Sequence, residues 1–192
     1  MPNAFEVLAG DHQEVLRLLT ELELGPTAAT GASPEQLDLR QKMVRLLVIE
    51  ESKHEAAEDM HFWPAVRRHL TDGDDLANQA QDQEQQAKFI LDRLDKVSSP
   101  EHEEFEAQIT HFITVGRAHI EFEQTFVWPG LQSALTAEEA DDLGRELTEA
   151  KETAPAHPHP NTPPVPGLLK IADAAEAAVN ALRDAITGRG DD

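Results

Sequence analysis

The fold is decided by residues 54–64, which read HEAAEDMHFWP. The same pattern returns without a gap at residues 119–129, which read HIEFEQTFVWP. Each stretch has a histidine and a glutamate four positions apart, followed by Trp-Pro. Residues at positions i and i+4 lie on one face of an α-helix, so each pair projects from its helix in a single direction. The repeat predicts a duplicated helical unit that directs two His/Glu pairs into a shared interior.

Helical periodicity extends over most of the chain, because apolar residues recur every three or four positions between clusters of glycine and proline. The chain is therefore expected to be all-α, with long helices over about 4–24, from a Ser33 cap to about Leu70, over about 75–97, and from Ser98-Ser99-Pro100 to about Leu135. A Thr136-x-x-Glu139 capping box predicts a short fifth helix that ends near residue 152. Long helices with short connections favour an antiparallel four-helix bundle.

A proline-rich segment divides the chain near its end. Residues 154–167 hold six of the chain's 12 prolines and cannot form a helix, so we interpret them as a semi-rigid tether. Apolar residues between Leu168 and Ile186 then predict a final helix, which either docks on the bundle or binds a second copy. The expected domains are a bundle over residues 1–153 and an extension over residues 154–192.

Composition limits the partners and the chemistry. The net charge of −21 disfavours nucleic acids and anionic membranes, which are themselves negatively charged. With no cysteine, a metal must be bound by nitrogen and oxygen atoms. The chain shows neither a secretory signal nor an apolar run long enough to cross a membrane, so the expected location is the cytoplasm. We expect a monomer or a weak homodimer.

Ionisable residues interrupt the apolar face of every long helix near its middle. A buried carboxylate without a partner costs several kcal/mol, and the four faces bring several together without a lysine or arginine. A bound cation would neutralise them, with neutral imidazoles as further ligands. The candidate ligands are His12, His54, Glu58, His61, Glu84, His119 and Glu123.

The order of these residues resembles the hemerythrin-like family, also called HHE cation-binding domains. The shared pattern is a histidine on the first helix, HxxxE with an aromatic residue and proline on the second, a histidine on the third, and HxxxE on the fourth. It covers about residues 4–135. The resemblance implies two iron ions bridged by carboxylates and an oxo or hydroxo group, and activities that bind oxygen or handle peroxide, nitric oxide or iron.

Carried over to this sequence, the family pattern assigns a role to five of the seven candidate ligands. It places His12 and His54 on one iron and His119 on the other, with Glu58 and Glu123 as bridges.

The chain departs from the pattern where Glu84 replaces the expected histidine and where His61 follows Glu58. We expect Glu84 and His61 to complete the shell of the second iron. Alternatively, Glu84 turns to solvent and His61 only lines a pocket.

An extra carboxylate ligand lowers the potential of the iron pair and favours oxidative chemistry over reversible oxygen carriage. The expected function is therefore redox chemistry on a small oxidant such as hydrogen peroxide, in the manner of a catalase. One alternative is a module that binds or senses oxygen, nitric oxide or iron without catalysis. Another is a structural bundle that a bound metal stabilises and that acts through contacts with other proteins.

Two further features have structural interpretations. The two Trp-Pro pairs are interpreted as apolar plugs at the helix ends, and Glu50 and Glu51 as surface charges or as partners of the ligands.

Overall fold

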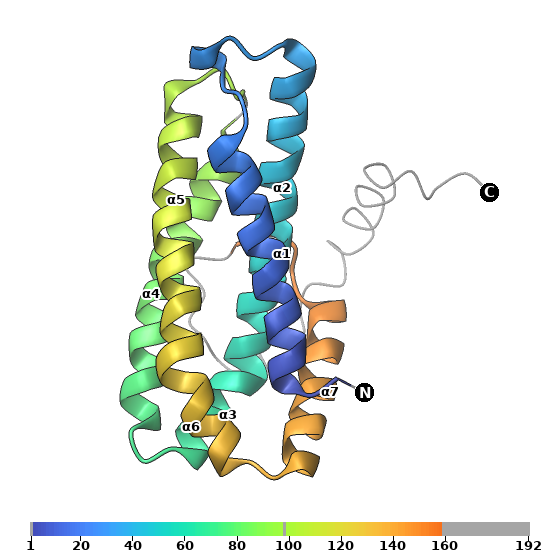
Figure 1. Ribbon diagram of the computed structural model, residues 1–192, viewed down its shortest axis with the longest axis vertical. Helices are drawn as coiled ribbons and strands as arrows, with labels where there is room; N and C mark the ends of the chain where they lie inside the picture. Colours follow the sequence, from blue (N-terminus) through green and yellow to red (C-terminus); the bar gives the residue numbers. More distant parts are fainter. Residues whose placement is uncertain (1, 98, 159–192) are drawn as a thin grey trace, which may run out of the picture.

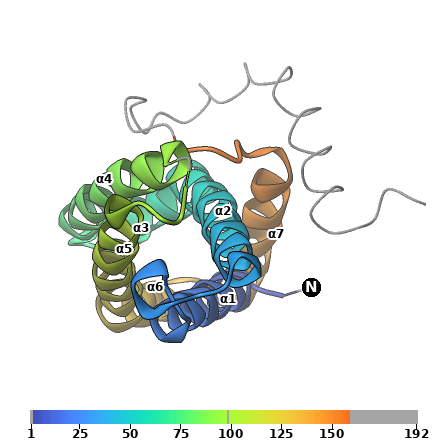
Figure 2. The ribbon, with the colours of Figure 1, turned by 90° about the horizontal axis from the view of Figure 1, so that it is seen from above.

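A computed structural model describes residues 2–97 and 99–158 of the chain. Four long helices run along the molecule in alternating directions and surround one core (Figures 1 and 2). They are α1 (Ala4–Leu24), α2 (Pro34–Ala57), α4 (Gly73–Lys96) and α5 (Glu103–Phe122), and a 3-10 turn, η1 (Ala28–Thr30), lies between the first two. The expected all-α antiparallel bundle is confirmed.

Both Trp-Pro stretches follow a π turn. α2 passes through η2 (Glu58–Phe62) into α3 (Trp63–His69), and α5 passes through η3 (Glu123–Val127) into α6 (Trp128–Ala134). The Trp63 N–H donates to the Glu58 carbonyl five residues earlier, and Trp128 does the same to Glu123. The proline that follows each tryptophan lacks an N–H and clashes with the preceding turn, so the helix widens there. The π turns therefore begin at two candidate ligands.

Helix starts agree with the capping signals in all but one case. Ser33 with Gln36, and Thr136 with Glu139, form the expected capping boxes. The fourth long helix, however, begins at Glu103 instead of directly after Ser99-Pro100. The hydroxyl of Ser99 accepts the N–H of Glu101, and its carbonyl accepts the N–H of His102, so these residues close a separate turn first.

The apolar core consists of two clusters with a polar layer between them. On α1, Leu8 belongs to one cluster and Val15 to the other, so His12 lies between them. On α4, Ala80 and Ala87 flank Glu84 in the same way. His12 and Glu84 are therefore covered by apolar side chains on both sides along the bundle axis, which excludes water from them.

The fifth helix of the prediction is α7 (Ala137–Thr153), which packs outside α1 and α2 (Figure 2). A Cβ atom added at Gly144 would lie 2.6 Å from the Pro2 carbonyl oxygen, so only glycine allows this close approach. The final helix expected after residue 168 lies outside the described residues. None of the helices in the described ranges is both long and apolar enough to cross a membrane.

Candidate metal centre

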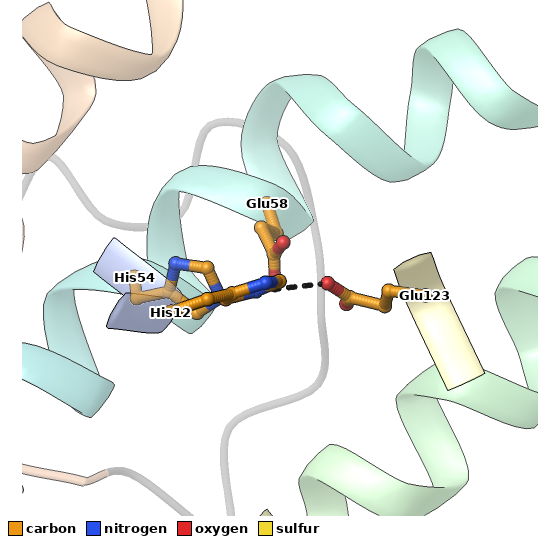
Figure 3. A group of neighbouring side chains, drawn as sticks. All are labelled: His12, His54, Glu58 and Glu123. Carbon is orange, nitrogen blue, oxygen red and sulfur yellow. Dashed lines mark ion pairs between the residues drawn. The ribbon is translucent and has the colours of Figure 1, made fainter. Parts of the chain in front are cut away.

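The fold brings six of the seven candidate ligands together in two groups. In each group, one ligand atom per residue lies within 4.8 Å of the others. The first group is His12, His54, Glu58 and Glu123, and the second is Glu58, Glu84, His119 and Glu123. Figure 3 shows Glu123 approaching the other three residues of the first group from the opposite side. Glu58 and Glu123 are common to both groups, so two adjacent positions share two carboxylates.

The ring Nε2 atoms of the three histidines face these carboxylates. His12 Nε2 lies 3.1 Å from Glu123 Oε2, and His119 Nε2 lies 3.0 Å from the other oxygen, Oε1. His54 Nε2 lies 3.3 Å from Glu58 Oε2. In each HxxxE motif the histidine therefore faces the glutamate of the same motif. Glu123 also faces His12 of α1, so it connects the two chain segments.

The second nitrogen of each imidazole contacts a polar side chain. His54 Nδ1 lies 3.3 Å from Asp11 Oδ2, and His119 Nδ1 lies 3.1 Å from Gln83 Oε1. His12 Nδ1 lies 3.1 Å from the amide of Gln124. Such contacts fix the ring orientation and aim Nε2 into the centre, as outer partners do for metal-bound histidines.

Several buried atoms of the centre have no hydrogen-bond partner among the residues that the structure describes. They are Nε2 of His12 and His119, both carboxylate oxygens of Glu58 and Glu123, and Oε2 of Glu84. Leaving such groups unsatisfied inside a protein costs about 1–3 kcal/mol each, and more for a charge. Nitrogen and oxygen atoms that converge in this way fit a bound divalent or trivalent cation.

The charges of the centre are strongly coupled. Burial and the nearby charge of Glu123 raise the pKa of Glu58 well above its usual range. Burial opposes ionisation of Glu123 as well, but His119 and His12 outweigh it and lower the pKa of Glu123. Burial also favours neutral His119, yet Glu123, Glu84 and Glu51 raise its pKa to about 9. Without a metal, the centre therefore retains protons that a cation would displace.

A lysine does reach this layer, contrary to the sequence-based expectation. Lys88 Nζ lies 3.5 Å from Glu84 Oε2, 3.1 Å from Asp59 Oδ2 and 3.8 Å from Glu55 Oε2. Lys88 begins outside the apolar face, but its long stem carries the ammonium group inward.

The two tryptophans contact the centre and do more than plug the helix ends. Trp63 Nε1 donates to Glu84 Oε1 at 2.6 Å. Trp128 instead stacks on His12, with ring centroids 5.2 Å apart and planes at 14°. The alternative in which Glu84 turns to solvent is wrong, because its side chain is fully enclosed.

His61 is the candidate that the fold does not bring to either group. Its Nδ1 atom lies 3.4 Å from Glu146 of α7, and its side chain is 27% exposed. His61 lies in the π turn that begins at Glu58, where the wider turn takes position i+3 off the face it would share in an α-helix.

Some polar neighbours of the centre were missed from the sequence in whole or in part. Glu51 and Glu55 are buried on α2, and burial raises the pKa of Glu51 to about 7, so of its two interpretations the surface charge is wrong. Glu51 lies three positions before His54 on the same helix face, whereas Glu55 directly follows an assigned position and had no signal. Asp11 and Gln83 did have one: when residues 9–22 are aligned with residues 81–94, His12 falls on Glu84, and Asp11 and Gln83 directly precede these two candidate ligands.

Comparison with known proteins identifies the family. The model of the hemerythrin HHE cation-binding domain matches residues 3–131. A solved structure of a hemerythrin HHE cation-binding domain-containing protein from Mycobacterium kansasii superposes with a TM-score of 0.64 and 25% identity, over 79% of this chain and 86% of that one. No curated protein matches the sequence. The matched region includes all six converging residues, and the chain belongs to the hemerythrin HHE cation-binding domain family.

Proposed function

We propose that the chain is a non-haem di-iron protein that does redox chemistry on a small oxidant, with hydrogen peroxide as the favoured substrate. The observation that carries the proposal is the pair of ligand groups that share Glu58 and Glu123. Two cation positions with two common carboxylates are typical of paired metal ions in helical bundles. A single structural ion would need only one such group.

In this proposal, two residues would bind each ion alone and two further residues would bind both ions. His12 and His54 would hold one ion, and Glu84 and His119 the other, while Glu58 and Glu123 would bridge. Iron at these positions would supply redox equivalents, because it cycles between the ferrous and ferric states. Imidazole and carboxylate donors suit iron and manganese. Because no thiolate is among the ligands, nothing in the site favours a softer metal.

The protein itself contributes orientation and a dry surrounding. Asp11 and Gln83 hold the imidazoles of His54 and His119, so that the ligand atoms are aimed before a metal arrives. The apolar clusters above and below the polar layer keep water from the centre. Three carboxylates among six ligands stabilise the ferric state, which favours reaction with an oxidant over reversible oxygen carriage.

The test is metal analysis and peroxide turnover of the full chain, purified with iron and without chelators. We expect two irons per chain, near-ultraviolet absorption of a ferric pair, and release of oxygen when peroxide is added. Glu123→Gln should abolish the release. The matched control is Glu121→Gln, which alters an exposed carboxylate on the same helix and should leave the release unchanged.

Other results would favour the competing functions. A reversible spectral change under oxygen, with no release from peroxide, would indicate a carrier or sensor. One zinc ion per chain and no reaction with either oxidant would indicate a structural metal. Either result would overturn the proposed redox function.

A further inference from the structure

The side chain of Glu84 is held from two sides. Trp63 Nε1 donates to Oε1 at 2.6 Å, and the ammonium group of Lys88 lies 3.5 Å from Oε2. Glu84 and Lys88 are four residues apart on α4, so one turn of helix keeps them adjacent. A carboxylate held in this way can direct only a limited set of lone pairs into the centre.

Lys88 is itself fixed in place. Its Nζ atom donates to Asp59 Oδ2 at 3.1 Å, and Gln81 Nε2 donates to the other oxygen of Asp59 at 2.8 Å. Arg67 in turn donates to Gln81 Oε1 at 2.7 Å. With only 16% of its side chain exposed, Lys88 is part of a polar network that runs inward from the surface.

The corresponding position in the other half of the repeat needs no such cation. There the residue is His12, which is neutral as a metal ligand and contacts the amide of Gln124 and the ring of Trp128. A charged Lys88 offsets part of the charge of an ionised Glu84, because the same ammonium group also contacts Asp59 and Glu55. Burial disfavours a charged lysine, but Glu55, Glu84 and Asp59 outweigh it and raise the pKa of Lys88.

We infer that Lys88 is a positioning residue that holds Glu84 in the centre and offsets part of its charge, so that a carboxylate with a neighbouring lysine replaces one imidazole. The inference rests on the proposed di-iron function. It changes what the ligand list alone predicts, because part of the extra negative charge at Glu84 is offset within the same helix. The potential of the iron pair is then set by both residues together.

A double-mutant cycle of the wild type, Lys88→Met, Glu84→His and the double variant tests this inference. The quantity measured is the reduction potential of the iron-loaded chain. Lys88→Met should lower the potential, because loss of a positive charge stabilises the ferric state. Glu84→His should raise it, and the double variant should return close to the original value. Lys96→Met is the matched control, since it removes an exposed lysine of the same helix that pairs with Asp92, and it should not move the potential.

Two further variants keep the test decisive. Lys88→Arg should preserve the potential because it preserves the charge. If Lys88→Met does not fold, Lys88→Gln replaces it in the cycle. A potential that responds to neither Lys88→Met nor Lys88→Gln, or a double variant whose potential stays as low as that of the lysine variant, would overturn the inference.

The same four proteins without metal separate this inference from the di-iron proposal. In urea, Lys88→Met should lower the midpoint of the Glu84→His chain less than it lowers the midpoint of the wild-type chain, because loss of Lys88 matters less once the Glu84 charge is gone. If the wild-type chain binds no iron, the proposed function fails, and this measurement still decides whether Lys88 and Glu84 are coupled. Additive changes in midpoint would overturn the coupling.

Discussion

The centre has two halves, one built on α1 and α2 around His12 and His54 and the other built on α4 and α5 around Glu84 and His119. The two halves have the same helical arrangement but differ in where they place charge. In the first half, the sequence pair Asp11-His12 puts the carboxylate behind the imidazole of His54 and a neutral ring at the ligand position. In the second half, Gln83-Glu84 reverses this arrangement, with the neutral amide behind His119 and the carboxylate at the ligand position. With His12 aligned on Glu84, each half therefore has one acid, and the two acids stand at positions that differ by one residue.

Each of these two acids lies beside a lysine. Lys151 of α7 donates to Asp11, and Lys88 of α4 contacts Glu84 together with Asp59 and Glu55. The two halves thus differ in where the acid lies and in how many carboxylates share the lysine. The comparison teaches that ligand identity alone does not describe a buried metal centre, because the cation that offsets a carboxylate comes from a different turn or a different helix.

The largest expected effect follows from the bridging residues that the halves share. If two irons bind as proposed, Glu58→Ala should remove both, because it deletes a residue common to the two groups, whereas Glu84→Ala should remove only the iron of the second group. Iron per chain after desalting measures this. Equal loss in the two variants would contradict the separation into two halves.

Removal of each lysine compares the halves in the metal-free protein. Lys88→Met leaves several buried carboxylates without a cation and should destabilise the fold by about 3–5 kcal/mol. Lys151 is exposed to a similar extent but serves one carboxylate, Asp11, which is 17% exposed, so Lys151→Met should cost only about 1 kcal/mol. Urea unfolding measures both, with Lys96→Met as the exposed control. A larger cost for Lys151 would mean that the charge of the first half is the more buried one.

Glu51 responds to charges in both halves, since Asp11 and Glu84 each raise its pKa in addition to burial. Its pKa in the folded chain is about 7, above the ordinary value of 4.5. A raised carboxyl pKa favours the fold when the group is protonated, so this stability is complete below about pH 4.5 and is lost as pH rises through 7. The metal-free protein should lose about 2 kcal/mol through this group between pH 5 and 8.

Glu51→Gln should flatten that part of the pH profile, which urea midpoints at several pH values would measure. Glu50→Gln is the neighbouring control and should leave the slope unchanged. An unaltered slope in Glu51→Gln would assign the pH dependence to the ligands themselves.

The smallest expected effect concerns the two tryptophans. Trp63→Phe and Trp128→Phe remove the same volume, but only Trp63 donates to a buried carboxylate. Trp63→Phe should therefore be more destabilising than Trp128→Phe by about 1 kcal/mol, the typical net worth of a hydrogen bond in a protein. Thermal unfolding of the metal-free variants measures the difference. Equal costs would show that Trp63 acts through packing alone.

The helices and most of the converging residues could be predicted because both depend on local geometry. Spacings of three and four residues define which side chains share a helix face, and capping residues mark where helices begin. His54 and Glu58 illustrate this, since a separation of four positions suffices to pair them. The same rule misplaced His61, because a π turn changed the angular step of the helix after Glu58.

Partners from different helices could not be predicted in this way. That Lys88 reaches Asp59, that Lys151 reaches Asp11, and that Trp63 donates to Glu84 each depend on which helices are neighbours and on how far a long side chain extends. Residue types and their intervals were thus enough to establish an acidic all-α bundle with an interior of imidazoles and carboxylates. The packing of the helices alone settled which acids have a counter-charge, because electrostatic partners are selected by distance in space and not by distance along the chain.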